Sequence, residues 1–311
     1  MTGAMGSRRK IYSGHSLMQH GYYKNRWMPL WLSIPQIIVM VLFFFIPIGM
    51  AFFWSFHLEQ PFGGGSRFVG WENYQRTFAD QEFWEALLRT VIFTIIGVFL
   101  SVGSALIIAV AADRAVRFSA LTRNLMMWPK AVSAAALGLI FIFLLDPYQG
   151  VFVYFNEIFP GVWNPRLDPT DTWTMLFIAN TWFAMSLSFI ILLAGLQGIP
   201  ENLHKAAAID GAGPWRRLWD IQLPLITPQL FIVVVLEIAD SVVASFSLIE
   251  TMTKGGPGDA TNLLVYKIYR DGFAGFDLSG AATQTALLMV LVIAVTSLQY
   301  VFLERRVEYE R

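Results

Sequence analysis

Six long apolar segments constrain this chain more than any other feature of its sequence. Each holds about 20 residues, the length that an α-helix needs to cross the hydrocarbon core of a bilayer. The segments lie at roughly 30–54, 87–112, 124–145, 173–197, 224–249 and 284–304. The composition agrees, because 56% of the residues are hydrophobic and only 14% are charged. We therefore predict an all-α polytopic membrane protein with six transmembrane helices.

The basic residues indicate how these helices are oriented. Most of the 22 lysines and arginines lie in the N-terminal tail, near 113–130, in 198–223 and at the C-terminal end. Because positive residues favour the cytoplasmic side of a membrane, both termini are predicted to be cytoplasmic. Residues 1–28 lack the apolar core and cleavage site of a signal peptide and are predicted to form a cytoplasmic tail. Residues 29–311 are predicted to form one transmembrane domain.

Several kinds of chemistry lack the residues that they need. The chain has no cysteine and four scattered histidines, so we expect no metal centre and no thiolate nucleophile. Its formal net charge of zero argues against nucleic acid as a partner. No Gly-x4-Gly-Lys-Ser/Thr phosphate loop occurs, and the stretch that starts at Lys254, Lys-Gly-Gly-Pro-Gly, lacks its spacing. We therefore expect a chain that is not an enzyme and binds no cofactor itself.

The fifth apolar segment carries a polar helix face. Its members fall at helical spacing on one side: Glu237, Asp240, Ser241 and Ser245. An ionised carboxylate at mid-bilayer costs about 2.5–3.5 kcal/mol, so this face is not expected to meet lipid. Two interpretations remain open. Either the face lines a water-accessible substrate pathway, or its acids pair with a neighbouring helix or subunit.

The fourth segment contributes a weaker polar stripe that contains Asn180 and Thr181. Polar residues of this kind line a pathway or join helices by hydrogen bonds. In the last loop, Lys254, Lys267 and Arg270 lie on the side that the charge bias assigns to the exterior. They are predicted to dock an external binding protein or attract an anion, or else to contact solvent and phospholipid.

The loop at 198–224 lies between the fourth and fifth segments. Pro200 suits the first turn of a short helix and Gly211 suits its end, because glycine adopts left-handed backbone angles readily. One side of this helix is predicted to form a docking surface with little side-chain bulk, from Leu203, Ala206, Ala207 and Asp210. A second short helix is predicted to begin at Pro214, lie at the membrane surface and stop before Pro224.

This loop resembles the cytoplasmic loop of permease subunits of bacterial ABC importers. That family carries Glu-Ala-Ala-x3-Gly-x9-Ile-x-Leu-Pro, and the matching residues here are Ala206, Ala207, Gly211, Ile221, Leu223 and Pro224. Lys205 stands where the family has its leading Glu. We call residues 198–224 the coupling loop. The resemblance implies that partner ATPases grip it through Leu203, Lys205, Ala206, Ala207, Asp210 and Gly211.

The family's architecture follows as an expectation from the same resemblance. It implies a type I importer permease fold in the bacterial cytoplasmic membrane, with a second homologous permease subunit and an extracytoplasmic solute-binding protein as partners. Two separate ATP-binding subunits would carry ATP and Mg²⁺. In maltose-type members the sugar lies near the midplane, between helices flanking the coupling loop, which makes Asn180, Thr181, Asp240 and Ser241 candidate pathway residues.

Further stretches are similar to the A-type permease subunit of sn-glycerol-3-phosphate importers. They include Pro61-Phe-Gly, Phe68-Val-Gly, Gly255-Gly-Pro and the run Tyr-Lys-Ile-Tyr-Arg-x-Gly-Phe-x-Gly that starts at Tyr266. The fifth segment departs from that subfamily, because Glu237 and Asp240 would oppose a phosphate dianion. A neutral sugar, a polyol or an anionic glycoside therefore remains open as the substrate.

An alternative function belongs to another class of protein. An ion-coupled secondary transporter would use Glu237 or Asp240 as its proton site. That interpretation explains the buried acids but leaves the coupling loop without a role. The chain also shows no evident inverted repeat, which many secondary transporters have.

Overall fold

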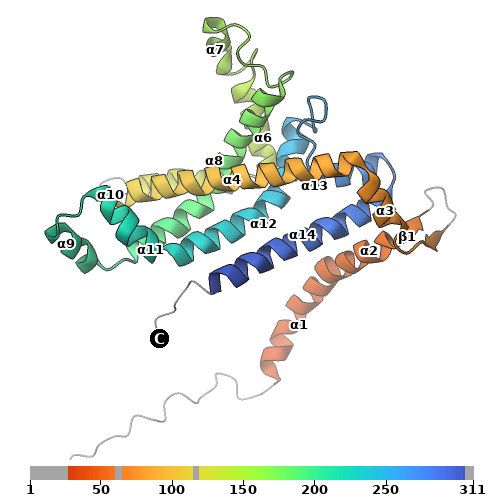
Figure 1. The fold of residues 1–311 in the computed structure, drawn as a ribbon, viewed down its shortest axis with the longest axis horizontal. Coiled ribbons are helices and arrows are strands. Elements are labelled where there is room, and N and C mark those ends of the chain that lie inside the picture. Colours follow the sequence, from red (N-terminus) through yellow and green to blue (C-terminus); the bar gives the residue numbers. More distant parts are fainter. Residues whose placement is uncertain (1–26, 60–64, 115–118, 305–311) are drawn as a thin grey trace, which may run out of the picture. The chain divides into compact units, whose positions relative to one another are not determined.

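The computed structural model describes residues 27–59, 65–114 and 119–304 (Figure 1). Most of the tail predicted at 1–28 lies outside these residues. Backbone proximity divides the chain into two units, Met1–Met50 and Ala51–Arg311. This boundary falls inside the first predicted span.

The first predicted span forms one apolar helical stretch, Met28–Ser55. It consists of α1 (Met28–Met40), a π-helical turn η1 (Val41–Phe45) and α2 (Ile46–Ser55). The wider π turn comes just before Pro47, which has no N–H and whose ring would clash with the carbonyl four residues earlier. This turn lets the helix continue through the proline.

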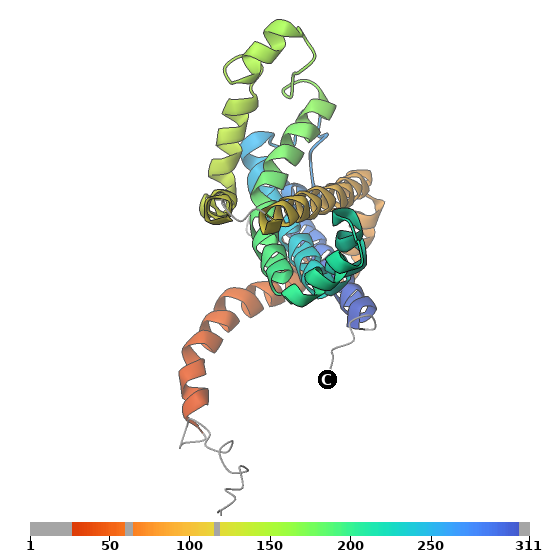
Figure 2. The same ribbon diagram turned by 90° about the vertical axis from the view of Figure 1, so that its left-hand side faces the viewer.

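Among the described residues, four apolar helices are long enough to cross a membrane: Met28–Ser55, Gln81–Arg114, Pro169–Gln197 and Leu278–Val301. The number rises to six spans if each of two bent pairs, one of which contains α12, counts as one. In the second unit the long helices are α4 (Gln81–Arg114), α8 (Pro169–Gln197), α12 (Thr227–Met252) and α14 (Leu278–Glu304). α4 makes its most extensive contact with α8, and α12 packs against both (Figures 1 and 2). The prediction of an all-α protein with several membrane spans is confirmed.

The third predicted span is not straight. α5 (Ser119–Ala131) and α6 (Ala134–Leu145) meet at a bend of 106°. Ser133 begins α6 by accepting a hydrogen bond from the backbone N–H of Ala136 at 3.3 Å. A serine at this position satisfies a helix N-terminus and so favours a new start over continuation. The hydropathy pattern, which reports only apolar length, did not indicate this bend.

The fifth span is also bent, by 70°. The bend separates α12 from the stretch that consists of α10 (Pro214–Arg217), a π-helical turn η2 (Leu218–Gln222) and α11 (Leu223–Leu225). The prediction that this helix stops before Pro224 is wrong, because the helix continues to Leu225. As at Pro47, the π turn precedes the proline: the N–H of Leu223 bonds to the carbonyl of Leu218, which leaves room for the proline ring.

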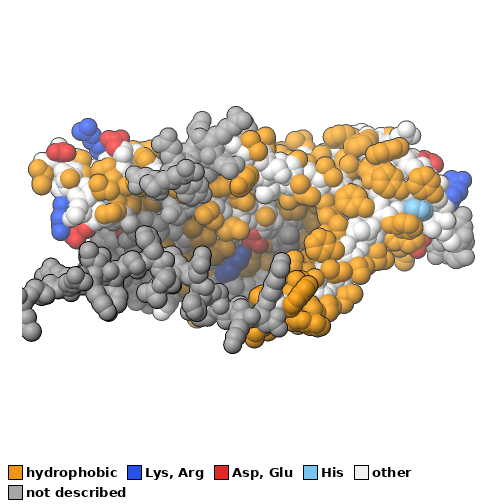
Figure 3. Space-filling view, turned by 90° about the horizontal axis from the view of Figure 1, so that it is seen from below, with side chains coloured by type: hydrophobic (Ala, Val, Ile, Leu, Met, Phe, Trp, Pro, Cys, Tyr) orange, Lys and Arg blue, Asp and Glu red, His pale blue; other side chains and the backbone are white. Residues whose placement is uncertain are grey.

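Shorter elements connect these helices. They are β1 (His57–Glu59) paired antiparallel with β2 (Ser66–Phe68), α3 (Glu72–Ala79), α7 (Phe152–Ile158), α9 (Glu201–Ile209), α13 (Leu264–Tyr269) and the π-helical turn η3 (Arg270–Ala274). Hydrophobic side chains predominate among the described residues on the face drawn in Figure 3, with few charged side chains between them. Such a surface suits a bilayer.

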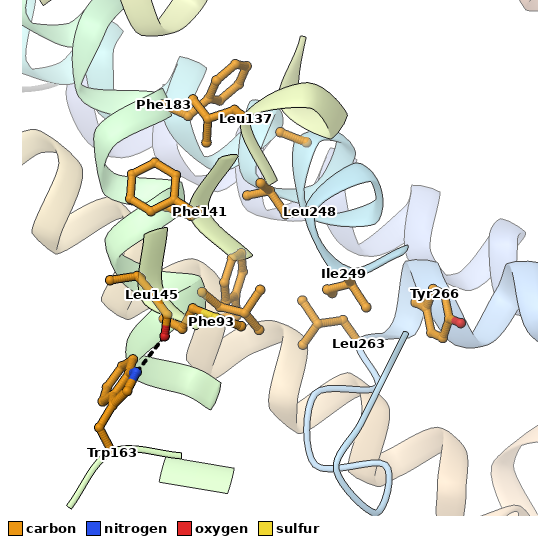
Figure 4. Packing of buried hydrophobic residues seen from close by; sticks show 14 residues of the cluster. Phe93, Leu137, Phe141, Leu145, Trp163, Phe183, Leu248, Ile249, Leu263 and Tyr266 are labelled. Atoms are coloured by element: carbon orange, nitrogen blue, oxygen red, sulfur yellow. Dashed lines mark hydrogen bonds between the residues drawn. The ribbon is translucent and has the colours of Figure 1, made fainter. Parts of the chain in front are cut away.

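The largest buried cluster joins α4, α6, α8 and α12. Phe93, Phe141 and Leu248 belong to it, and the indole N–H of Trp163 donates to the carbonyl of Leu145 at 2.7 Å (Figure 4). A second cluster is rich in small residues, because Ala105 and Ala109 on α4 face Leu192 on α8. Small residues let the two backbones approach closely, as is common between membrane helices.

Candidate functional sites

Glu237 lies buried inside the helix bundle. Its carboxylate accepts a hydrogen bond from the hydroxyl of Ser188 on α8 and another, at 3.5 Å, from Ser101 on α4. A buried acid needs such neighbours, because burial removes it from the water that would otherwise solvate it. The carboxylate therefore links α12 to α4 and α8. This agrees with the interpretation in which an acid of the polar face contacts neighbouring helices.

The two serines of the same face are buried as well. The Ser241 hydroxyl donates to the Thr94 hydroxyl on α4 at 3.0 Å. The Ser245 hydroxyl donates to the backbone carbonyl of Val242 at 3.0 Å. Both groups thus have partners within the bundle.

Asp240 differs from these three neighbours. Its carboxylate pairs with the Lys130 ammonium on α5 at 2.6 Å, and the two side chains are 41% and 33% exposed. The ammonium also lies 4.1 Å from the centre of the Phe183 ring on α8, a favourable contact for a cation. Lys130 is absent from the residues predicted above. A lysine within the third apolar segment is the sequence signal that points to it.

Asn180 and Thr181 occupy the middle of α8. Asn180 is buried, and a Cβ atom at Gly97 on α4 would come within 3.0 Å of its amide nitrogen. Glycine at 97 therefore lets the amide approach α4. The Thr181 hydroxyl is buried and has no hydrogen-bond partner within the described part of the chain.

The coupling loop has the predicted helix and end. α9 starts directly after Pro200, and Gly211 has a left-handed φ of +73°. The N–H of Ala212 closes the helix by bonding to the carbonyl of Ala207 at 2.9 Å. Of the six predicted coupling residues only Ala207 is buried; Leu203, Lys205, Ala206, Asp210 and Gly211 are exposed. The helix therefore presents a free surface, and Lys205 pairs with Glu201 in its own helix at 3.2 Å.

The three basic residues predicted for docking have different surroundings. Lys254 is exposed, has a left-handed φ of +49° and makes no ion pair with any described residue. Lys267 on α13 is only 4% exposed, and its ammonium contacts Asp271 at 2.8 Å, Asp80 at 3.2 Å and Glu82 at 3.6 Å. Of the three, only Lys254 and part of Arg270 are therefore accessible at the surface.

Arg270 belongs to the same group of charges. Its guanidinium bonds to Asp259 at 2.7 Å and also to Glu82. We call this group the ion cluster: Asp80, Glu82, Asp259, Lys267, Arg270 and Asp271. It ties the start of α4 to α13 and η3 (Figure 1).

Electrostatics keeps the ion cluster charged. Burial lowers the pKa of the Lys267 ammonium, but the hydrogen bond and charge of Asp271 and the charge of Glu82 outweigh it, so that the pKa lies above its ordinary 10.5. The pKa of Arg270 is raised in the same way: burial lowers it, while Asp259 and Glu82 raise it. Both side chains are therefore cations at neutral pH.

A second polar group lies after α6. Asp146 accepts the backbone N–H groups of Tyr148 and Gln149 at 2.7 and 3.0 Å and pairs with Arg166. Burial raises the pKa of Asp146. The backbone hydrogen bonds and the hydrogen bond and charge of Arg166 together lower it by more, so that the pKa lies below its ordinary value. Asp146 and Arg166 line a cavity of about 360 Å³ between the α6 and α8 ends and the loop after α12. Within the described residues no group of three acids or histidines is arranged to hold a metal ion.

Comparison with known proteins assigns the chain to a family. The sequence pattern of the family described as "Binding-protein-dependent transport system inner membrane component" matches residues 103–309. The chain therefore belongs to that family. It is an inner-membrane, multi-pass permease subunit of a binding-protein-dependent ABC importer.

Particular relatives match over nearly the whole chain. The sn-glycerol-3-phosphate transport system permease protein UgpA of Rhizobium meliloti (strain 1021) is 38% identical over 94% of this chain and 100% of its own length. UgpA of Agrobacterium fabrum is 39% identical with the same coverage. UgpA of Salmonella typhimurium is 38% identical over 93% of this chain and 98% of its own.

A solved structure shows the same fold. One chain of a bacterial ABC transporter involved in the import of the acidic polysaccharide alginate superposes with a TM-score of 0.79 and 19% identity, covering 91% of this chain and 96% of that one. At this identity the likeness supports the fold and nothing finer. It confirms the predicted type I importer permease fold.

Proposed function

We propose that this permease subunit takes part in the import of sn-glycerol 3-phosphate or a closely similar polyol phosphate. The observation that carries the proposal is the similarity to UgpA permeases along 94% of the chain, at 38% identity. The proposed complex contains a second homologous permease subunit, two ATP-binding subunits that hold ATP and Mg²⁺, and an external solute-binding protein.

The charges in the bundle are compatible with a phosphate substrate. Glu237 is enclosed by serine hydroxyls, and Asp240 is paired with Lys130. The pathway is therefore not faced by two free negative charges, which was the sequence-based objection to a phosphate dianion. A neutral sugar, a polyol or an anionic glycoside is the alternative substrate.

The coupling loop is proposed to face the cytoplasm, together with both termini. Its exposed α9 would fit into the ATP-binding subunits, and their closure would move residues 200–213 and so open the pathway to the other side. Only a difference in contact between the two states of the ATPases can shift that equilibrium. An ion-coupled carrier would have no use for this surface.

We propose that the Lys130–Asp240 pair faces the pathway. Lys130 lies at the bend of the third span, Asp240 lies near the middle of α12, and both are substantially exposed. Contact of either charge with the hydrocarbon would be costly. Asn180, Thr181, Glu237, Ser241 and Ser245 would then support this part of the pathway from behind, because all of them are wholly or largely buried.

Reconstitution of the complex in liposomes tests the function. We expect glycerol 3-phosphate, presented by the binding protein, to stimulate ATP hydrolysis and ATP-driven uptake. Stimulation only by a neutral sugar, a polyol or a glycoside would replace the substrate while keeping the importer. Uptake by this chain alone that collapses with a protonophore would replace the importer with an ion-coupled carrier.

Paired substitutions test the pathway. Replacing both charges, Lys130→Gln with Asp240→Asn, leaves no unpaired ion and should preserve the stability of the complex. If Lys130 meets the phosphate, uptake of glycerol 3-phosphate should fall by roughly ten- to a hundredfold, the range for a lost hydrogen bond to a charged group. Asp240→Asn alone should keep uptake, because Lys130 remains. Normal uptake by the double variant would remove the pair from the pathway.

A further inference from the structure

A cavity of about 280 Å³ lies where the coupling loop meets the last turn of α4. We call it the coupling pocket. Its lining residues come from α4, α9, both ends of α10 and η2: Asp113, Arg114, His204, Pro214, Arg217 and Gln222. A water molecule in liquid occupies about 30 Å³, so the space is large enough for a small organic group. The pocket thus joins the longest helix to the loop proposed for coupling.

Two arginines supply donors to the coupling pocket. An N–H of Arg114 bonds to the carbonyl of Pro214 at 3.3 Å, and the Nε–H of Arg217 bonds to the carbonyl of Ala212 at 2.9 Å. Each guanidinium has five N–H groups, so most of them remain for a ligand. Neither arginine forms an ion pair with an acid in the described ranges. Such unneutralised guanidinium groups are suited to a phosphate.

The same pocket contains acceptors for which no described residue supplies a donor. Gln222 is 4% exposed, and its side-chain oxygen has no hydrogen-bond partner among the described residues. Asp113 is partly buried and makes no ion pair there either. A buried acceptor left unpaired is unfavourable. The pocket therefore suits a ligand that has hydroxyl donors in addition to an anionic phosphate.

The surroundings favour a lipid source for this ligand. Trp215 and Trp219 lie on the same short helical stretch as Arg217 and Gln222, and both indoles are exposed. Exposed tryptophans are typical of the headgroup level of a bilayer, and basic pockets between helices on the cytoplasmic side bind anionic headgroups. The two arginines outweigh the single acid, which favours an anionic over a zwitterionic lipid.

We propose that the coupling pocket binds a hydroxyl-bearing phosphate ester, namely the headgroup of phosphatidylglycerol. The phosphate would accept from Arg114 and Arg217, and the glycerol hydroxyls would donate to Gln222 and Asp113. Because this ligand bridges α4 and the coupling loop, its binding stabilises the loop position that the ATP-binding subunits meet. The inference rests on the proposed function for the cytoplasmic orientation of the loop.

Binding can be measured on the purified complex without ATP or substrate. Short-chain phosphatidylglycerol, phosphatidate and phosphatidylcholine are titrated while the thermal unfolding of the complex is followed. Phosphatidate carries the anion without glycerol hydroxyls, and free glycerol 3-phosphate tests the soluble form of the same chemistry. We expect phosphatidylglycerol to bind most tightly and phosphatidylcholine least.

Matched variants locate the site. Arg217→Gln should weaken phosphatidylglycerol binding about tenfold, whereas Arg216→Gln should change it less than twofold. Arg216 is the appropriate control, because it lies next in the sequence but outside the pocket and pairs with Asp220. Gln222→Leu should abolish the preference for phosphatidylglycerol over phosphatidate while the unliganded complex remains folded.

Three outcomes would overturn the proposal. Equal losses in the two arginine variants would indicate general surface attraction, and equal binding of phosphatidylcholine would remove the need for an anion. Stabilisation by free glycerol 3-phosphate without a lipid effect would replace the lipid by a soluble ester. A complex that binds phosphatidylglycerol through Arg217 but is not stimulated by glycerol 3-phosphate would refute the proposed substrate and leave the pocket intact.

Discussion

At one end of α4 the ion cluster joins three elements through a buried lysine, whereas at the other end the coupling loop leaves most of its side chains exposed (Figure 1). Lys267 contacts three carboxylates, but Lys205 has one exposed partner in its own helix. At the first end, carboxylates of the same chain pair with the buried ammonium. The second end presents an exposed surface whose ion pairs stay within its own short helices, as expected of a segment that binds other subunits.

The contrast has an energetic side. Removing one member of a buried ion group leaves uncompensated charges and costs several kcal/mol, while an exposed pair contributes little. Substitutions in the ion cluster should therefore reduce stability, and substitutions in the coupling loop should reduce transport. Three variants test this division, from the largest expected effect on stability to the smallest.

Lys267→Met should have the largest effect. It leaves Asp80, Glu82 and Asp271 without the ammonium between them, and we expect a loss of about 3–5 kcal/mol in the free energy of unfolding. Denaturant or thermal unfolding of the detergent-solubilised complex measures it. Lys254→Met is the matched control, with an expected change within about 0.5 kcal/mol, because Lys254 is exposed. Equal effects of both variants would show that the ion cluster does not hold this end together.

The pH dependence of the stability lost in Lys267→Met provides a sharper test of the ion cluster. Folding raises the pKa of Lys267 above its ordinary 10.5. The stabilisation is therefore fully present below the unfolded-state pKa and is lost as pH rises through the folded-state pKa. The difference in the free energy of unfolding between the wild type and Lys267→Met should stay constant from about pH 6 to 9 and become smaller only in stronger alkali.

Gly211→Val should have a moderate effect on stability and a large one on transport. A left-handed residue costs an L-amino acid about 1–2 kcal/mol, and a β-branched one resists that conformation most. No atom lies within 4 Å of a Cβ at this position, so the effect comes from the backbone rather than a clash. We expect ATP hydrolysis to persist while uptake falls at least tenfold.

Gly213→Ala is the control for this position. Gly213 also has open space around its Cβ position, but its φ of −66° is one that alanine adopts readily. Uptake by this variant should equal that of the wild type. Normal ATP-driven uptake by Gly211→Val would show that the end of α9 does not transmit the ATPase motion.

Sequence alone indicated the features that depend on neighbours along the chain. Apolar length predicted the spans, and the glycine at 211 predicted where α9 ends. The sequence could not show which helices bring their polar groups together. The contacts of Asp240 with Lys130 and of Lys267 with Asp80 join residues far apart in sequence, and they depend on helix packing.

The bends escaped prediction for a related reason. A hydropathy average reports the apolar residues on both sides of Ser133 but not the capping hydrogen bond with which α6 begins there. Pro224 was predicted to end a helix because of its missing N–H, yet the preceding π turn accommodates it. Local propensity was overridden by a change in hydrogen-bond register that propensity does not encode.

Lys205→Ala should have the smallest effect. Lys205 is 63% exposed and pairs only with Glu201, itself 78% exposed, four residues earlier. Exposed pairs at this spacing contribute about 0.3–0.5 kcal/mol, so the unfolding free energy should barely change. We also expect uptake within about twofold of wild type, because docking then depends on the shape set by Ala206 and Gly211 rather than on this charge. A tenfold loss of uptake with unchanged stability would instead show that the ammonium meets an acid on the ATP-binding subunit. In that case the lysine that replaces the family's glutamate marks a reversed ion pair between subunits.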